Sequence, residues 1–323
     1  MDKIVYVHNI LNNIQDDCIV LYDNFKNHIF SDIDYSVIEG VVPMWIRNAG
    51  NTAECGFSKE LFEKIVAANN NVLTNKFLYV YDCNMMIAAL QDRFSMIGVL
   101  VEKFYSKMSA ESLYKMEDFD SATMSISEMD TDIFAYLNSI FIFLGSSFDL
   151  LTKVGSELKN IDKTDYLSYP KLKSKNIQFG DFKLIHNDLK KETIFCRPNI
   201  VKQIESIRNR IVHDGSFDFR QIIYIGHIEK DDYSESCIMF PDFEDCQFAS
   251  YKNRRNFYSE SSRINLILPN MLIEILEVIL ETIKKINSIY SKERFSNETD
   301  FLTYREEIHN WSKSALMVFR HCP

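Results

Sequence analysis

Three long segments of this chain place an apolar residue at every third or fourth position. They run from Ile87 to Met108, from Phe134 to Leu158 and from Leu272 to Tyr290. This spacing gives a helix one apolar face, which must be buried against another apolar face. The three segments therefore predict long helices that pack side by side, and they favour a mainly α fold.

A shorter fourth helix is predicted over residues 199–215, where isoleucines recur with the same spacing. Asn199 is expected to cap its start and Gly215 to end it, and Pro269 is expected to mark the start of the third long helix. Four helices with one apolar face each suit an antiparallel bundle. The predicted fold is therefore a mainly α, antiparallel helical bundle.

The remaining segments suggest how the bundle is elaborated. The bundle is predicted over residues 81–295, with an N-terminal accessory region over 1–80 and a C-terminal tail over 296–323 that packs on the bundle. The stretch 216–260 has β-branched and aromatic residues on both sides of an acidic turn, which predicts a β-hairpin insertion. With 323 residues, 46% of them hydrophobic, the chain can form one large domain or two small ones.

Within the accessory region the pattern is less decisive. The segments 3–10 and 18–25 are compatible with short strands or with helix, since each is too short to separate the two periods. The segment 58–80 predicts one helix with a polar middle.

Composition also sets expectations about location and partners. No apolar run is read as long enough to span a bilayer, and no signal peptide is recognised, so we expect a soluble, cytoplasmic protein without a membrane partner. Seven cysteines without any C-x-x-C pair fit a reducing compartment. The net charge of −10 argues against broad coating of nucleic acid but leaves room for a local basic patch.

The stretch "SIRNRIVHDGS", residues 206–216, departs from ordinary core and surface. On a helix, Glu205, Asn209 and His213 share one face, and Arg208 flanks them. Arg208 and His213 differ by roughly 140° in direction and about 7.5 Å in height, a gap that a long arginine side chain can bridge. The predicted helix thus gathers a guanidinium, an amide and an imidazole at its C-terminal end.

These side chains match the needs of RNA cleavage without a metal ion. An imidazole can move a proton at the 2′-hydroxyl or at the leaving oxygen, and a guanidinium can stabilise the negatively charged phosphorane. Asn209, one turn before His213, is placed to orient the ring. The plainer alternative is a solvated polar face whose histidine interacts favourably with the helix dipole.

The motif "RNRIVH" resembles the R-x4-H signature of HEPN domains, small helical bundles in which Asn commonly follows the Arg. The resemblance covers the motif and, more loosely, residues 81–295. It implies a metal-independent ribonuclease that leaves a 2′,3′-cyclic phosphate, with Arg208 and His213 catalytic and Asn209 orienting them. The insertion 216–260 is longer than a minimal HEPN connection.

The resemblance also implies partners. HEPN proteins typically act as homodimers in which two motifs form one composite cleft on an RNA substrate, and they recur in toxin, CRISPR-associated and anti-phage systems. We therefore expect a homodimer that is a toxin or an antiviral effector. A further hypothesis is that the accessory regions respond to a trigger or to a regulatory protein partner.

Further RNA contacts are predicted outside the motif. The stretch "YKNRRNFY", residues 251–258, interleaves Lys252, Arg254 and Arg255 with aromatic residues, a composition that binds phosphates and stacks bases. Its alternative reading is a basic turn. Arg210 is expected to contact RNA phosphate or only solvent.

No metal site and no cofactor are predicted. The remaining histidines and cysteines lack ligand spacing, and the chain contains no glycine-rich nucleotide loop and no H-E-x-x-H motif. The alternative to an enzyme is a non-catalytic bundle that serves as a dimerisation or partner-binding module, in which case no RNA is cleaved under any condition.

Overall fold

The structure is a computed structural model of the chain. It describes residues 3–31, 35, 42–53, 56–111, 123–125, 128–181, 189, 191–216, 218, 221–228, 233–259 and 262–290. The predicted C-terminal tail, 296–323, lies outside these residues. The described part is mainly helical, which confirms the predicted fold class at that level.

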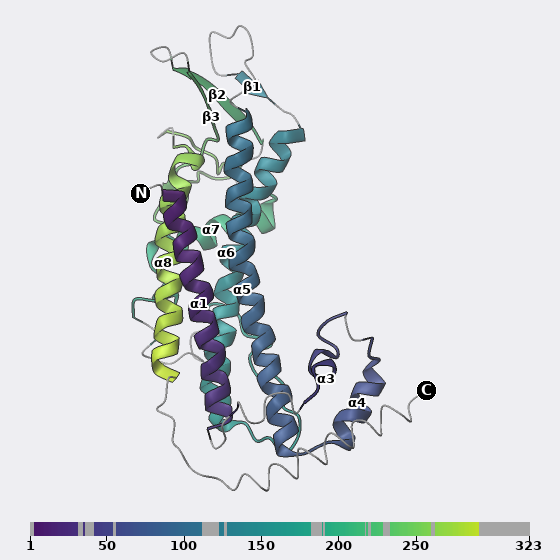
Figure 1. Ribbon diagram of the computed structural model, residues 1–323. Coiled ribbons are helices and arrows are strands. Elements are labelled where there is room, and N and C mark those ends of the chain that lie inside the picture. The colour runs from purple at the N-terminus through teal and green to yellow at the C-terminus, as the bar shows by residue number, and fades with distance from the viewer. Residues whose placement is uncertain are drawn as a thin grey trace. The chain divides into compact units, whose positions relative to one another are not determined.

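Helices account for most of the described elements, and strands occur in two small sheets (Figure 1). The helices are α1 (Lys3–Ile29), α3 (Met44–Asn48), α4 (Lys59–Ala68), α5 (Val72–Glu111), α6 (Glu128–Asn160), α7 (Asn199–Asp214) and α8 (Ile264–Tyr290), with short 3₁₀ turns at Ile161–Lys163 and Ile194–Cys196. The strands are β1 (Thr123–Ser125), β2 (Ile223–Ile228), β3 (Tyr233–Cys237), β4 (Phe243–Glu244) and β5 (Gln247–Phe248).

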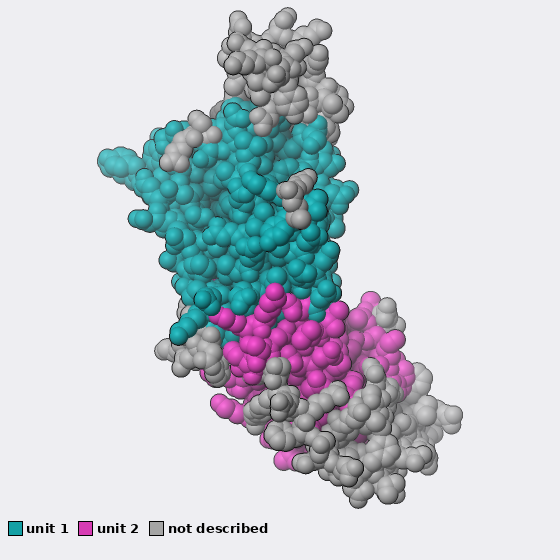
Figure 2. All heavy atoms as spheres, turned by 60° about the vertical axis from the view of Figure 1, so that its left-hand side comes forward, with its two compact units in different colours: residues 1–16, 90–149, 187–283 teal, residues 17–89, 150–186, 284–323 magenta. Residues whose placement is uncertain are grey.

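The chain divides into two compact units, coloured teal and magenta in Figure 2. Unit 1 comprises residues 1–16, 90–149 and 187–283, and unit 2 comprises the rest of the chain. Each of the helices α1, α5, α6 and α8 contributes residues to both units. Unit 1 combines the start of α1 with most of residues 81–295.

In unit 1, α5 runs antiparallel to α6. The Arg93 guanidinium lies 4.8 Å from the ring centroid of Phe143, and Lys107 near the end of α5 pairs with Asp132 near the start of α6 at 3.4 Å. Sequence numbers therefore rise along α5 as they fall along α6. The predicted apolar stripes form this core, since the side chains of Phe94, Ile97, Val101, Phe104, Phe134, Leu137, Phe141 and Leu144 are fully buried.

Helix α1 belongs to the same core and resolves the uncertainty at the N-terminus in favour of helix. Gln15 donates to the carbonyl of Gln91 at 2.9 Å, and one side of Gly98 faces Leu11, so α1 is also antiparallel to α5. The Tyr6 hydroxyl donates to Glu277 of α8 at 2.9 Å. The successive helices α1, α5 and α6 thus alternate in direction within unit 1.

The segment 58–80, predicted as a single helix, contains α4 and the start of α5, both in unit 2. The Asn69 side chain donates to the carbonyl of Ile65 at 2.7 Å and closes α4. The Asn71 side chain accepts from the Thr74 amide at 2.8 Å and opens α5. Asparagine side chains compete with helical backbone hydrogen bonds, which explains the break within the run of asparagines.

The third long helix begins before Pro269, which corrects its predicted start. Helix α8 starts at Ile264 and carries Pro269 inside it. A proline lacks the amide that would bond to the carbonyl four residues earlier, here that of Asn265. The Tyr105 hydroxyl of α5 donates to this carbonyl at 2.8 Å. The helix therefore continues through proline with the freed acceptor satisfied.

The predicted hairpin is present in the insertion. Strands β2 and β3 pair antiparallel, with Gly226 opposite Glu235, and β1 adds to the other edge of β2. A second, smaller hairpin joins β4 to β5 through Asp245 and Cys246, which both have positive φ (48° and 65°). This is the conformation of a tight two-residue hairpin turn. Strand β5 lies against α7, where Ser206 donates to Gln247 at 3.1 Å.

No apolar run was expected to be long enough to span a bilayer, but α6 is. Its residues Thr131–Asn160 are long and apolar enough, by length and composition alone, to cross a membrane. A core helix passes the same criterion. The stripe predicted from the sequence, including Phe141 and Phe148, is at most 1% exposed against the rest of the chain, as in a core helix.

Candidate active site at the end of helix α7

Helix α7 presents the predicted motif because its apolar face anchors it in unit 1. Ile200, Ile204 and Ile207 are at most 2% exposed. Pro198, not Asn199, occupies the N-cap position, and Asn199 is the first helical residue. Gly215 ends the helix, as predicted, with φ of 89° and its amide bonded to the carbonyl of Ile211 at 3.1 Å. The motif therefore occupies the last two turns.

Arg208 and Asn209 form a hydrogen-bonded pair. The Arg208 Nη1 donates to the Asn209 Oδ1 at 2.9 Å, and Asn209 is exposed. The Arg208 stem lies across α6 at Gly145, where a Cβ added to the glycine would come within 2.8 Å of the Arg208 Cγ. The absence of a side chain at position 145 thus makes room for the arginine between the two helices.

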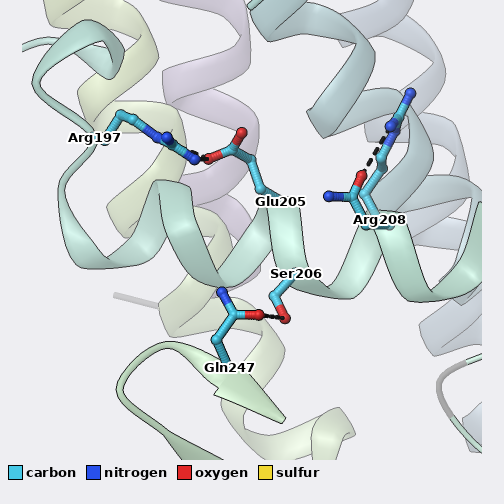
Figure 3. A network of polar contacts seen from close by, with 6 residues as sticks. Arg197, Glu205, Ser206, Arg208 and Gln247 are labelled. Carbon is cyan, nitrogen blue, oxygen red and sulfur yellow. Dashed lines mark hydrogen bonds and ion pairs between the residues drawn. The ribbon is translucent and has the colours of Figure 1, made fainter. Parts of the chain in front are cut away.

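Glu205 forms an ion pair with an arginine that precedes the helix. The Arg197 Nη2 and the Glu205 Oε2 are 2.6 Å apart, and the Arg197 Nε donates to the same oxygen at 3.2 Å. In Figure 3 the Glu205 carboxylate is turned toward Arg197 and away from Arg208. Arg208, three residues further along α7, therefore pairs with a neutral amide rather than with this carboxylate.

His213 lies in the last turn of α7 and is exposed. Within the described part of the chain, its imidazole makes no hydrogen bond or ion pair. The neighbouring Val212 is 48% exposed. The imidazole is thus accessible to a substrate or to a second protein, and Asn209 one turn earlier is bonded to Arg208 rather than to the ring.

The structure brings the two candidate stretches together. The Arg210 Nη1 donates to the carbonyl of Arg255 at 3.0 Å, and the Arg210 Nη2 donates to Asn256. In return, the Arg255 Nη1 pairs with the Asp214 Oδ2 at 2.8 Å. The basic aromatic loop 251–258 is therefore tied to the end of α7 that carries His213.

These contacts separate the four basic residues predicted to bind RNA into two pairs. The Arg210 Cζ lies 4.4 Å from the ring centroid of Phe248. Burial is the main cause that lowers the pKa of Arg210, but the guanidinium stays charged. Arg210 and Arg255 hold the loop through intramolecular bonds. Lys252 and Arg254 are exposed and have no acidic partner within the described residues. Within the described residues, Lys252 and Arg254 are therefore the two of these four cations that are not engaged in holding the loop.

Comparisons with known proteins add no assignment. No protein family, curated protein or solved structure matches the chain. Within the described residues, no group of three or more histidine, cysteine, aspartate or glutamate side chains is placed to hold a metal ion. The chemistry of the site rests on its own geometry.

Two residues that shape the site were not predicted. Gly145 lies on α6 and Arg197 lies in the left-handed region (φ 51°) just before α7. Neither belongs to the motif, and each acts through a contact that spacing along the sequence does not encode. A glycine in the middle of an apolar helical stripe is the one signal that points to a close approach at position 145.

A second polar cluster, in unit 2, is read as structural. The fully buried Glu157 carboxylate accepts from the Tyr79 hydroxyl and from the amides of Lys173 and Ser174, the latter at 2.8 Å. Burial raises the pKa of Tyr79. Because both carboxylate oxygens already accept hydrogen bonds from the protein, this group anchors residues 173–174 to α6 rather than awaiting a ligand.

Proposed function

We propose that this chain is a metal-independent RNA endonuclease of the HEPN type, acting as a homodimer. The observation that supports the proposal best is the end of α7, where Arg208 and Asn209 are hydrogen-bonded, His213 is accessible, and Arg210 and Asp214 hold the basic loop 251–258. A guanidinium, an imidazole and exposed cations are the groups that phosphodiester cleavage without a metal requires.

In the proposed reaction the ribose 2′-oxygen attacks the adjacent phosphorus and the bond from phosphorus to the 5′-oxygen breaks. The 2′-hydroxyl loses its proton and the departing 5′-oxygen gains one. His213 serves one of these transfers, and Arg208, held by Asn209, binds the non-bridging oxygens as charge develops. The products are a 2′,3′-cyclic phosphate and a 5′-hydroxyl.

The test compares the ends of RNA incubated with four full-length proteins in EDTA. Wild type is expected to leave a 2′,3′-cyclic phosphate, and His213→Ala and Arg208→Ala are expected to leave the RNA intact. The matched control is Lys202→Ala, which removes an exposed cation from the same helix and is expected to cleave as wild type does. Cleavage by His213→Ala in EDTA would contradict the assignment.

The alternative, a non-catalytic bundle that binds a partner, gives the opposite result. Wild type would then leave RNA intact with and without added divalent cations.

The proposed role as a toxin or anti-phage effector has its own readout. Expression of wild type, but not of His213→Ala, is expected to arrest the growth of the cells that produce the protein.

A further inference from the structure

We infer that the loop 251–258 binds single-stranded RNA, with the rings of Tyr251 and Phe257 stacking on bases and Lys252 and Arg254 binding phosphates. The inference rests on the proposed function, because it names the form of RNA that the same site accepts. It also assigns two aromatic residues that the motif does not contain.

The aromatic rings of this loop are left in solvent. Tyr251 is 65% exposed and Phe257 is 38% exposed, although unit 1 buries most of its other phenylalanines. The Lys252 ammonium lies 5.3 Å from the Tyr251 ring centroid. A cation beside an exposed ring provides at one place the two interactions that a nucleotide offers, a base face and a phosphate.

The backbone of the loop is nevertheless fixed. Tyr251 and Arg254 exchange amide and carbonyl hydrogen bonds at 2.9 Å each, across a turn in which Lys252 has φ of 53°. The Phe257 carbonyl accepts from the Asp242 amide at 2.7 Å. Because the backbone is already ordered, binding does not carry the entropic cost of ordering it, and the rings are presented in advance.

The position of the loop links binding to cleavage. Through Arg210 and through the Arg255 pair with Asp214, the loop is held at the last turn of α7, next to His213. Base faces are accessible for stacking only where bases are unpaired, so a strand seated on the two rings is single-stranded as it approaches the imidazole.

The test measures binding with full-length His213→Ala protein, so that no RNA is cut. The probe is a fluorescein-labelled twelve-residue oligouridylate, followed by fluorescence anisotropy. Tyr251→Leu and Phe257→Leu are each expected to weaken binding at least about fivefold, the effect of losing one stacked base. Tyr251→Phe keeps the ring and is expected to bind as the parent does.

Salt dependence tests the two cations separately. Lys252→Gln and Arg254→Gln are each expected to reduce the slope of log affinity against log salt by about 0.7, the value for one phosphate contact on a single strand. Lys202→Gln, an exposed cation of α7 outside the loop, is the matched control and is expected to leave the slope unchanged.

Several results would overturn the inference. They are unchanged affinity in Tyr251→Leu, equal affinity for the same oligonucleotide annealed into a duplex, and no binding of either form, which would leave the loop to a protein partner. The outcome is separable from that of the nuclease proposal. If RNA binding depends on Tyr251 but wild type does not cleave RNA, only the nuclease proposal is refuted. If wild type and Tyr251→Leu cleave RNA at the same rate, only the loop assignment is refuted.

Discussion

Arg208 occupies space that any side chain at position 145 would fill. A Cβ on Gly145 would lie 2.8 Å from the Arg208 Cγ and 3.3 Å from its Cβ, and atoms so near the backbone cannot swing aside easily. Gly145→Ala is therefore expected to displace the guanidinium and to slow RNA cleavage at least about tenfold, because small misplacements of a positioning group are costly. Initial rates on labelled RNA provide the measurement.

Gly98→Ala is the matched control for that substitution. Gly98 also lies inside a helix of unit 1, but its added Cβ would meet the Leu11 Cδ1 at 3.4 Å, an ordinary contact. This variant is expected to keep the wild-type rate and to gain up to about 1 kcal/mol in helix propensity. Equal rates in the two alanine variants would contradict the role given to Gly145.

Arg197 pairs with Glu205, the carboxylate three residues before Arg208 on α7. Residues three apart on a helix are neighbours, so a Glu205 released by Arg197→Ala is expected to pair with Arg208. The pair would compete with phosphate, and cleavage is expected to fall about 1.5- to twofold, on the scale of such pairs. The measurement is the rate at low ionic strength, where the effect is largest.

A second substitution separates charge from folding in this prediction. In Arg197→Ala with Glu205→Gln the competing carboxylate is gone, so the rate is expected to return toward wild type. A rate that stays low in the double variant would show that Arg197 acts by supporting the start of α7 instead.

The motif and its surroundings differ in how far the sequence reveals them. Arg208, Asn209 and His213 could be predicted because all three lie on one helix, whose period places them by counting. Gly145 and Arg197 could not, because their contacts cross between elements. The sequence also did not separate Arg210 and Arg255, which tether the loop, from the exposed cations Lys252 and Arg254, since all four share a charge.

At the scale of elements, one hydroxyl supplies the hydrogen bond that α8 lacks at Pro269. Tyr105→Phe removes the donor to the Asn265 carbonyl and is expected to lower the free energy of unfolding by about 1 kcal/mol, the cost of an unmade hydrogen bond in a partly buried place. Urea titration followed by circular dichroism measures this change.

Pro269→Ala supplies the test of the mechanism. Alanine at 269 restores an amide that can bond to the Asn265 carbonyl, so Tyr105→Phe is expected to cost less in that background than in wild type. Equal losses in both backgrounds would show that the tyrosine hydroxyl stabilises the protein by another route.

The elements themselves were predicted well where a long apolar period decided them. Helices α6 and α7, and α5 over residues 87–108, lie where the period places them, because burial of an apolar face dominates their energetics. The errors fall at helix boundaries where polar side chains form hydrogen bonds with the backbone. Asn69 and Asn71 split a predicted helix, and the Tyr105 hydroxyl, distant in sequence, lets α8 begin five residues before Pro269.

For the whole molecule, the proposed homodimer would bring two copies of the end of α7 together. Arg208 has Asn209 as its hydrogen-bond partner, while His213 and Val212 are exposed at the same helix end. A second α7 opposite the first would add a second guanidinium and imidazole around one phosphate and would cover Val212. The helical period does not predict such a pairing and a single chain does not show it, so the homodimer is a prediction.

If two copies form the site, cleavage depends on concentration. Below the dissociation constant of the dimer, the rate per chain is expected to fall in proportion to protein concentration, because dimers are the active species. Val212→Glu would place two like charges at the contact and is expected to shift the mass measured by light scattering toward the monomer and to lower the rate. Val99→Glu, on an exposed position of α5, is the matched control and is expected to leave both unchanged. A constant rate per chain across the dilution, from a protein of monomer mass, would show that one copy of α7 suffices.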